Sequence, residues 1–286
     1  YIGGTIEDEG DLTLQTPESF YKRFRVKMNV RHEVTALHPE SKMVTVKNIE
    51  NGTVFTETYD KLILSPGAKP IKPNFEGIDS DKIFTLRTVE DTLKIKKLIN
   101  EKYPKSAVVV GGGFIGIEVA ENLRELGIDV TLVEAADQLM APFDSDMASF
   151  IHAELRKNGV NLMLGRFVEG FADTDDGICV KLKNSPTLHA NMVVMAIGVA
   201  PETTLAKDAG LELGIKGSIV VNDRMETSVP DIYAVGDAVQ IRNFVTDTGA
   251  LISLAGPANK QGRIAADNIC GIDSHYRGSQ GSSVIT

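Results

Sequence analysis

Three glycines stand at a spacing that suits phosphate binding. Gly111, Gly113 and Gly116 directly follow the apolar run 107–110 and open a stretch whose apolar residues have helical spacing. Such a turn lets the backbone approach a pyrophosphate, and the following helix presents unpaired N–H groups to the phosphate oxygens. Glu134 ends the next apolar run, where a carboxylate can bind a ribose 2′-hydroxyl. The spacing therefore predicts a dinucleotide site.

The residues around Glu134 indicate which dinucleotide would bind. A carboxylate repels the 2′-phosphate of NADPH, and Ala135, Ala136 and Asp137 supply no cation to offset that repulsion. The sequence therefore favours NADH over NADPH. The alternative interpretation of the glycines is a tight strand–helix turn in another α/β fold. Gly198 ends the apolar strand predicted over 191–197, and it could lie against the same ligand or form an ordinary turn.

The elements that must position this turn can be traced over residues 88–226. Thr88 and Asp91 match a capping box that starts a helix. The run 107–110 predicts a strand buried on both faces, and 130–133 predicts its neighbour. A helix is predicted whose apolar face carries Met147, Phe150, Ile151 and Leu155. A turn between two strands is predicted at 175–177. The pattern predicts an α/β domain with a parallel sheet.

The flanking segments, 1–87 and 227–286, contain shorter signals. Asn51-Gly52 between two β-rich runs predicts a hairpin. The run 61–64 predicts a buried strand that stops at Ser65-Pro66-Gly67. A short apolar strand ends at Gly236-Asp237, where the acid could bind a polyol or cap a helix. Pro257 suits the first turn of a helix that starts near Leu254 and Ala255.

Composition excludes several classes of protein. The chain has 286 residues, which suggests two domains, and its net charge of −9 argues against a nucleic-acid partner. Two cysteines cannot build a disulfide scaffold, and the five histidines show no metal-binding spacing. No apolar run is long enough to span a membrane. The chain starts at Tyr1 rather than Met, and 282–286 has the pattern of an interrupted strand, so we expect a piece of a longer protein.

These motifs together resemble the flavoprotein pyridine nucleotide–disulfide oxidoreductases. The resemblance is to the branch that contains coenzyme A-disulfide reductase, NADH oxidase/peroxidase and NADH-dependent persulfide reductase. It covers essentially the whole chain and rests on 1–4, 64–68, 111–116, 232–237, 254–259 and 278–284. It implies a Rossmann-like NAD domain (88–226) inserted in an incomplete FAD domain (1–87 and 227–286). The family's N-terminal FAD fingerprint, its redox cysteine and its C-terminal dimerisation domain are expected outside this chain.

The resemblance also implies roles for individual residues. Phe114 would lie over the flavin, Glu118 would lie near the nicotinamide, and Ile115 would be a further NAD contact. Without the resemblance, Phe114 is a core aromatic and Glu118 a solvated residue. Asp237 would bind the ribityl chain of FAD, and Val34 would place its backbone against the adenine. The other FAD contacts implied are Ser65, Pro66, Gly67, Gly236, Leu254 and Ala255. Cys179 is interpreted as strand packing and Cys270 as a residue near a helix end, so neither is the redox cysteine.

The implied activity is NADH-dependent reduction of FAD. A cysteine upstream of Tyr1 would then reduce coenzyme A disulfide or a low-molecular-weight persulfide. Two alternatives remain open: an NADH oxidase, peroxidase or ferredoxin-type reductase on the same scaffold, or a non-catalytic NAD(H)-binding fragment. The resemblance further implies a cytoplasmic homodimer whose partners are small molecules, without nucleic acid or membrane.

Overall fold

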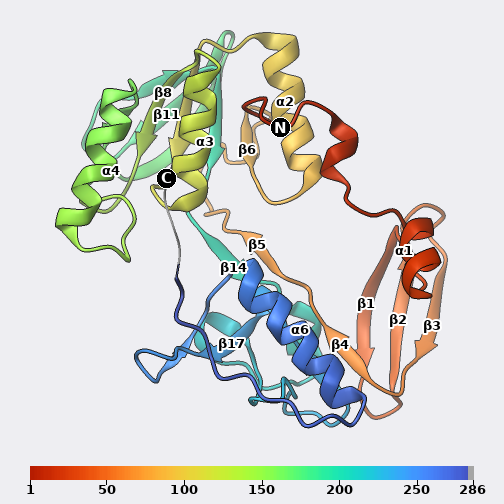
Figure 1. The fold of residues 1–286 in the computed structure, drawn as a ribbon. Coiled ribbons are helices and arrows are strands. Elements are labelled where there is room, and N and C mark those ends of the chain that lie inside the picture. Colours follow the sequence, from red (N-terminus) through yellow and green to blue (C-terminus); the bar gives the residue numbers. More distant parts are fainter. Residues whose placement is uncertain (283–286) are drawn as a thin grey trace. The chain divides into compact units, whose positions relative to one another are not determined.

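The computed structural model describes residues 1–282 and divides into two compact units (Figure 1). Unit 1 comprises residues 1–14 and 70–199, and unit 2 comprises 15–69 and the chain from residue 200 onward. The main segment of unit 1 thus lies, in sequence, between the two segments of unit 2. The end of the interrupted strand and of the 278–284 motif, residues 283–286, lies outside the described residues.

Unit 1 is built on a parallel sheet of five strands. Their spatial order is β6-β13-β7-β8-β9, with bounds Ile83–Thr85, Met192–Met195, Ser106–Val110, Asp129–Val133 and Asn161–Met163. Three helices connect successive strands: α2 (Val89–Lys102), α3 (Phe114–Glu125) and α4 (Ser145–Lys157). A second, antiparallel sheet contains β10 (Val168–Thr174), β11 (Gly177–Leu182) and β12 (Leu188–Ala190). This arrangement confirms the predicted α/β fold class.

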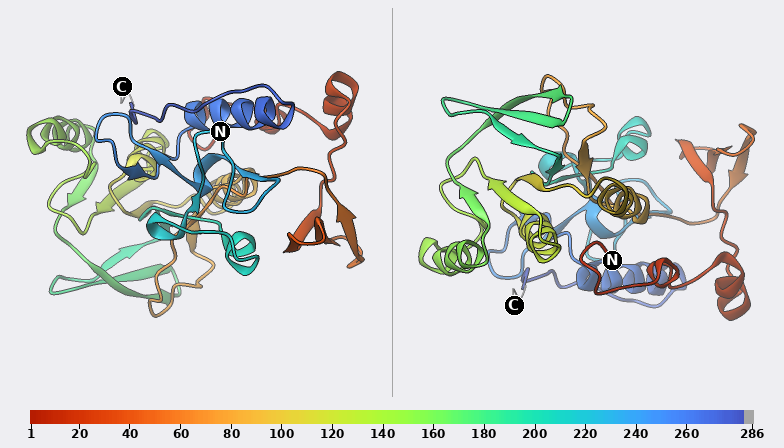
Figure 2. Two further views of the ribbon diagram at one scale, coloured as in Figure 1. Left: turned by 90° about the horizontal axis from the view of Figure 1, so that it is seen from below. Right: turned by 90° about the horizontal axis from the view of Figure 1, so that it is seen from above.

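The unbroken apolar run of β7 follows from burial on both faces of the parallel sheet. Ala107 and Val109 pack against residues of the helices, including Ile95, Leu123 and Leu155. Val108 and Val110 pack on the opposite face against β10 and β11. Figure 2 shows β10 and β11 (green) as a long hairpin beside the parallel strands. A strand with no solvated face needs no polar alternation, so the prediction of a doubly buried strand is confirmed.

The sequence patterns predicted helix α2 correctly and helix α4 only in part. The Thr88–Asp91 capping box at the start of α2 is present, with both reciprocal hydrogen bonds. On α4, however, the expected apolar face is only partly correct. Leu155 is buried, whereas Met147 and Phe150 are exposed, Phe150 by 70%. The helix turns its buried face toward Ala148 instead, a small residue that brings its backbone close to the core.

Unit 2 combines small sheets with a long helix. Its antiparallel sheet, order β1-β2-β3, contains the predicted Asn51-Gly52 hairpin, and β4 pairs in parallel with β16. The strands are β1 (His32–His38), β2 (Met43–Asn48), β3 (Val54–Thr58), β4 (Leu62–Leu64), β15 (Ile219–Val220), β16 (Ile232–Ala234), β17 (Val239–Arg242) and β18 (Gly249–Ala250). The helices are α1 (Pro17–Phe24), α5 (Thr204–Asp208) and α6 (Ala255–Ile269), with 3-10 turns η2 (Ile215–Gly217) and η3 (Gly236–Ala238). In unit 1, η1 spans Glu9–Leu12. The unit boundaries at 69/70 and 199/200 fall within β5 (Ala68–Pro70) and β14 (Val199–Pro201), which pair with each other.

The unit boundaries differ from the predicted domain boundaries, 87/88 and 226/227. Strand β6, at residues 83–85, pairs with β13 and therefore belongs to the sheet of unit 1. Strand β15, at 219–220, pairs with β17 and belongs to unit 2. Both strands are too short to carry a periodic signal of their own, so long-range pairing decides their membership.

Strand β4 is less buried than the sequence indicates. Its three residues are half-buried or exposed, and Ile63 is 40% exposed. Among the described residues β4 pairs on one side only, with β16. Lys42 and Lys61 both donate to Asp231, next to β16, and hold the pKa of that carboxyl at about 2. The Lys61 pair helps to fix the start of β4 beside β16, and the Lys42 pair does the same for the start of β2.

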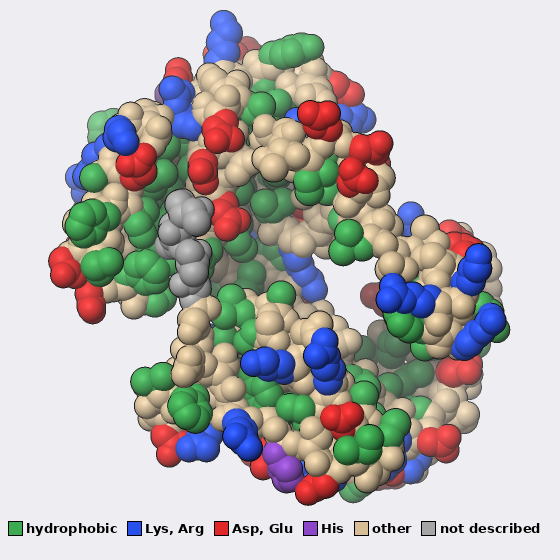
Figure 3. Space-filling model, in the orientation of Figure 1, with side chains coloured by type: hydrophobic (Ala, Val, Ile, Leu, Met, Phe, Trp, Pro, Cys, Tyr) green, Lys and Arg blue, Asp and Glu red, His purple; other side chains and the backbone are tan. Residues whose placement is uncertain are grey.

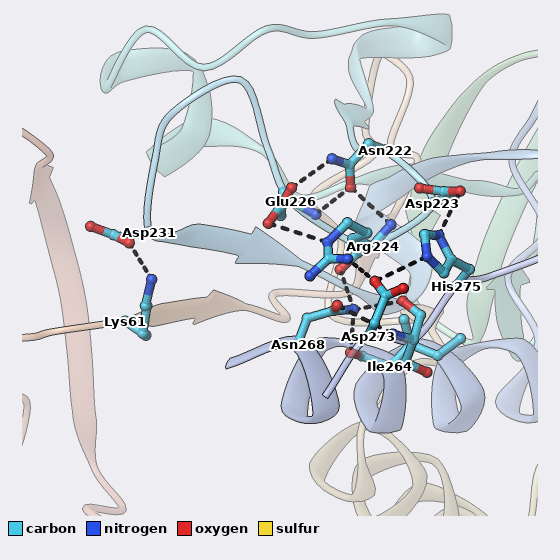
Figure 4. A network of polar contacts seen from close by, with 11 residues as sticks. Lys61, Asn222, Asp223, Arg224, Glu226, Asp231, Ile264, Asn268, Asp273 and His275 are labelled. Atoms are coloured by element: carbon cyan, nitrogen blue, oxygen red, sulfur yellow. Dashed lines mark hydrogen bonds and ion pairs between the residues drawn. The ribbon is translucent and has the colours of Figure 1, made fainter. Parts of the chain in front are cut away.

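A polar network holds residues 273–276 against the turn 222–226 (Figure 4). The His275 ring lies between two carboxylates, with Nδ1 at 2.9 Å from Asp223 and Nε2 at 3.1 Å from Asp273. Asp273 also pairs with Arg224. The Asn268 amide, on α6, donates to the carbonyl oxygens of Arg224 and Ser274. The segment is therefore tethered by both charge and backbone contacts.

This network predicts a pH dependence for the stability of unit 2. The hydrogen bonds that the protonated His275 ring donates to Asp223 and Asp273 raise the pKa of His275 above its ordinary value of 6.5. A raised pKa means that the stabilisation is complete below pH 6.5 and is lost as pH rises through the higher folded-state value. We expect urea midpoints of the wild type to fall across that window and those of His275→Gln to change less. His38→Gln, in which an exposed ring bonded to Thr45 is replaced, is the control; equal pH dependence in wild type and His275→Gln would contradict the prediction.

Candidate functional site

The glycine turn of unit 1 joins β7 to α3 and is shaped by close packing. Gly111 has a φ of +111°, and a Cβ there would lie 2.3 Å from the Ala196 carbonyl oxygen. A Cβ on Gly116 would lie 1.9 Å from the Gly111 carbonyl oxygen. Only glycine fits both positions, because any side chain would collide with backbone. These two residues therefore let helix α3 sit directly against the strand end.

Gly113 differs from its neighbours because it faces open space. Nothing lies within 4 Å of a Cβ built on it, and its φ of −85° suits any residue. The fold of the described chain therefore does not need glycine here. Gly113 is the N-cap of α3 and offers no side-chain cap, so the first N–H groups of the helix lack that partner. Such a helix end, with clear space before it, can receive a phosphate.

Glu134 reaches across the glycine turn from the end of β8. Its Oε2 accepts a hydrogen bond from the Gly112 N–H at 2.6 Å, and its Oε1 accepts one from Ala136 at 2.7 Å. A carboxylate has about four acceptor positions, so both oxygens can still accept from a ribose hydroxyl. Gly112 was missed by the sequence analysis. A Cβ there would meet Leu139 Cδ2 at 2.3 Å, so any larger residue at this position would require the buried Leu139 side chain to move.

Gly198 lies beyond the carboxyl end of the neighbouring strand, β13. Because β13 and β7 are parallel and adjacent, their ends meet at one edge of the sheet. The approach of Gly111 to Ala196 shows this directly. Gly198 has a φ of +117°, and its carbonyl oxygen accepts from the Ile71 N–H at 3.0 Å. The structure thus brings Gly198 to the same sheet edge as the glycine turn, which is where ligands bind in parallel α/β sheets.

Phe114, Ile115 and Glu118 form the solvent-facing side of the first turns of α3. Phe114 is 40% exposed, which is inconsistent with a core aromatic. Ile115 and Glu118 line a pocket of about 410 Å³ together with Asn122 of α3 and with residues at the start of α2 and in the N-terminal segment, among them Tyr1, Ile2, Thr88 and Thr92. All three predicted residues are therefore accessible to a ligand bound at the helix start.

The predicted flavin residues lie in unit 2, where they form two groups. In the first group, Gly236 follows β16 with a φ of +81°, and Asp237 lies in the 3-10 turn after it. The Gly236 N–H donates to the buried Gln261 of α6 at 2.6 Å. Leu254 and Ala255 form the start of α6, which also lacks a side-chain cap. Gln261 thus ties the Gly-Asp turn to the helix, and no sequence motif indicated this role.

Gln261 is expected to support the folded state of unit 2. Its side chain is 1% exposed, and replacement by leucine would leave the Gly236 N–H without its acceptor. An unpaired polar group of this kind costs about 1–3 kcal/mol. We expect chemical denaturation of Gln261→Leu to show a loss of that size. The same change at exposed Gln280 should be nearly neutral, and equal stability of the two variants would contradict this role.

The second flavin group lines an apolar pocket of about 250 Å³. Val34 of β1 and Ser65 and Pro66 after β4 all contribute to its wall, with Leu37, Ile63 and Leu205. Gly67 has a φ of +71°, and its carbonyl oxygen accepts from the Glu202 N–H at 2.9 Å. The backbone bond from Val235 to Leu64 joins the ends of β16 and β4. Residues far apart in sequence are therefore brought together, although Val34 and Leu254 line different pockets.

Other kinds of site have little support in residues 1–282. No group of three or more His, Cys, Asp or Glu side chains there could hold a metal ion. No helix within the same range has both the length and the apolar character that crossing a membrane requires. On the face drawn in Figure 3, acidic and basic side chains are interspersed over each unit.

Comparisons with known proteins place the chain in a family. The family model described as pyridine nucleotide-disulphide oxidoreductase matches residues 5–262. The chain is 38% identical to an NADH oxidase of Methanocaldococcus jannaschii over 96% of its length, and 35% identical to a coenzyme A disulfide reductase of Staphylococcus aureus over 99%. It covers 61% and 64% of those two proteins. The crystal structure of reduced Bacillus anthracis CoADR-RHD matches all of this chain with a TM-score of 0.97 and 47% identity, over 51% of that chain. The chain belongs to the pyridine nucleotide-disulphide oxidoreductase family.

Proposed function

We propose that unit 1 binds NADH at the glycine turn and that the complete protein is an NADH-dependent flavin oxidoreductase. The observation that carries the proposal is the contrast between the glycines. Gly111 and Gly116 are required by internal packing against backbone, whereas Gly113 is required by nothing within the described chain. A glycine that borders open space at a helix N-terminus fits a ligand that must come close to the backbone.

Different residues of unit 1 would bind different parts of NADH. The N–H groups at the start of α3 would hold the pyrophosphate, because the helix end carries a partial positive charge. Glu134, already oriented by two backbone N–H groups, would accept from the ribose hydroxyls and disfavour a 2′-phosphate. Phe114, Ile115, Glu118 and Gly198 would border the nicotinamide end of the cofactor. The name of the M. jannaschii relative supports NADH as the electron donor.

The residues of unit 2 fit part of an FAD site. The Gly236 turn is held open by a positive φ and by Gln261, which leaves the Asp237 carboxylate at the start of a short turn where a ribityl chain could bond to it. The uncapped start of α6 could face the flavin ring, with Leu254 and Ala255 at its first positions. Val34, Ser65, Pro66 and Gly67 would border the remainder of the cofactor. When bound, the two cofactors supply the electron transfer, and the protein orients them.

The electron acceptor we propose is a small disulfide or persulfide, with coenzyme A disulfide first. The S. aureus relative, named coenzyme A disulfide reductase, supports this choice. Oxygen is the second candidate, because the M. jannaschii relative is named an NADH oxidase. A cysteine outside this chain would contact the disulfide. A cytoplasmic homodimer stays a prediction from the family resemblance.

The experiment that tests this function is an anaerobic NADH titration of the full-length protein loaded with FAD. We expect the flavin absorbance to bleach at about one equivalent of NADH and to return when coenzyme A disulfide is added. Recovery only with oxygen would support the oxidase alternative. Failure of NADH to bleach bound flavin would overturn the proposal.

A further inference from the structure

A cysteine and a histidine face each other on the antiparallel sheet of unit 1. Cys179 on β11 and His189 on β12 are direct cross-strand partners. The Cys179 Sγ lies 3.3 Å from Nδ1 of the His189 ring and 3.9 Å from Nε2. Directly opposite partners on one face of a sheet have neighbouring side chains. Register therefore sets this contact, so it does not depend on a flexible side chain reaching across a loop.

The pair lies on the outer side of that sheet. The neighbours of Cys179 along the strand, Ile178 and Val180, are fully buried and point into the core. Cys179 itself is half-buried, and His189 is exposed. Strand alternation thus turns the thiol away from the core, and the imidazole beside it can reach solvent. The interpretation of Cys179 as core packing does not explain this orientation.

The nearest neighbours of the pair on this face are an alanine and a lysine. On its other side Cys179 is opposite Ala172 of β10. The next outward residue of β11 is Lys181, whose ammonium group lies 2.8 Å from the Glu76 carboxylate. A carboxylate next to the sulfur would oppose formation of a thiolate-like transition state. Neither of these two neighbours carries one, and the Glu76 carboxylate beyond them is paired with Lys181.

We propose that Cys179 is a thiol-modification site that reacts with low-molecular-weight disulfides, with His189 as its general base. The Cys179 sulfur attacks one sulfur of the disulfide while its proton passes to His189 Nδ1. The new bond joins Cys179 to half of the disulfide, and the other half leaves as a thiolate that takes up the proton. Cys179 is oxidised to a mixed disulfide and the leaving half is reduced, so no further oxidant is needed. The reaction requires neither NADH nor flavin and is separate from the proposed function.

Cys270 provides an internal reference within the same chain. It directly follows α6, is more exposed than Cys179, and its Sγ has no hydrogen-bond partner within residues 1–282. If exposure alone governed the reaction, Cys270 would be modified first. If the histidine matters, the less exposed Cys179 reacts first. The two cysteines therefore separate the two explanations without any mutation.

The test is modification of the intact protein by excess Ellman's reagent at neutral pH, without NADH. Peptide-resolved mass spectrometry gives the rate at each cysteine. We expect Cys179 to react at least about tenfold faster than Cys270, because a positioned general base typically contributes about 10²- to 10⁴-fold and the greater exposure of Cys270 offsets part of that gain. Oxidised coenzyme A should give the same order, with the coenzyme A adduct on the peptide that contains Cys179.

Substitution of His189 tests whether this residue is the general base for the modification of Cys179. His189→Gln should slow modification of Cys179 about tenfold and leave Cys270 unchanged. His38→Gln, on β1 in unit 2, should change neither rate. The proposal is overturned if Cys270 reacts first in the wild type, or if Cys179 in His189→Gln keeps the wild-type rate. The comparison within the wild type stands even if His189→Gln proves unstable.

Discussion

Gly113→Ala is expected to lower NADH affinity at least about tenfold while the stability of unit 1 stays within about 0.5 kcal/mol of the wild type. The added methyl group meets nothing in the described chain, and the backbone conformation at this residue suits alanine. It would project into the space assigned to the pyrophosphate, so the cost appears only when the ligand is bound. Calorimetric titration with NADH and thermal unfolding of the same sample measure both quantities.

Gly116→Ala is the matched comparison. The same methyl group would lie 1.9 Å from the Gly111 carbonyl oxygen, so helix and turn must separate before it can be accommodated. Overpacking of this kind typically costs about 1–3 kcal/mol, and we expect the variant to lose both stability and binding. If Gly113→Ala binds NADH as tightly as the wild type, the pyrophosphate does not lie at this turn. If Gly113→Ala is as unstable as Gly116→Ala, Gly113 has a structural role.

The double variant Glu134→Ala with Ala135→Arg is expected to shift cofactor preference toward NADPH by about a hundredfold. Hydrogen bonds that involve a charged group contribute about 1.5–3 kcal/mol. Removing the carboxylate abolishes its hydrogen bonds with the ribose of NADH and so weakens NADH binding. It also removes the repulsion of a 2′-phosphate, which the new guanidinium would attract. Dissociation constants for NADH and NADPH, measured on wild type and variant, give the shift.

The control for charge alone is Glu125→Ala, which removes an exposed carboxylate from the end of α3. It should leave both dissociation constants within about twofold of the wild type. A preference that stays with NADH in the double variant would contradict the role given to Glu134.

Local signals predicted several elements of both units because they are carried by contiguous residues. The capping box at Thr88, the buried run before Gly111 and the hairpin at Asn51-Gly52 each depend on a few neighbours in sequence. All three appear in the structure. The fold class and the position of the glycine turn follow from them.

Features that depend on long-range packing could not be predicted in this way. Gly112 has no motif position of its own, and the limited space for a side chain there comes from Leu139, which lies 27 residues further along the chain. The exposure of Phe150 depends on which neighbours cover α4, and that of Ile63 on which strands pair with β4. The contact between Gln261 and Gly236 joins segments whose proximity is set by the fold of unit 2. The periodicity of a sequence indicates single helices and strands, and it does not predict contacts between elements that are far apart in the chain.

Hydrogen exchange of the backbone amides, measured by mass spectrometry with and without saturating NADH, tests the central claim most directly. If the pyrophosphate of NADH lies at the start of α3, the amides of residues 112–116 should be protected when NADH is bound. The peptide around Glu134 should be protected with them, and NADPH at the same concentration should protect both less. Protection confined to unit 2, or an unchanged exchange rate at 112–116 in NADH-bound protein, would contradict the account.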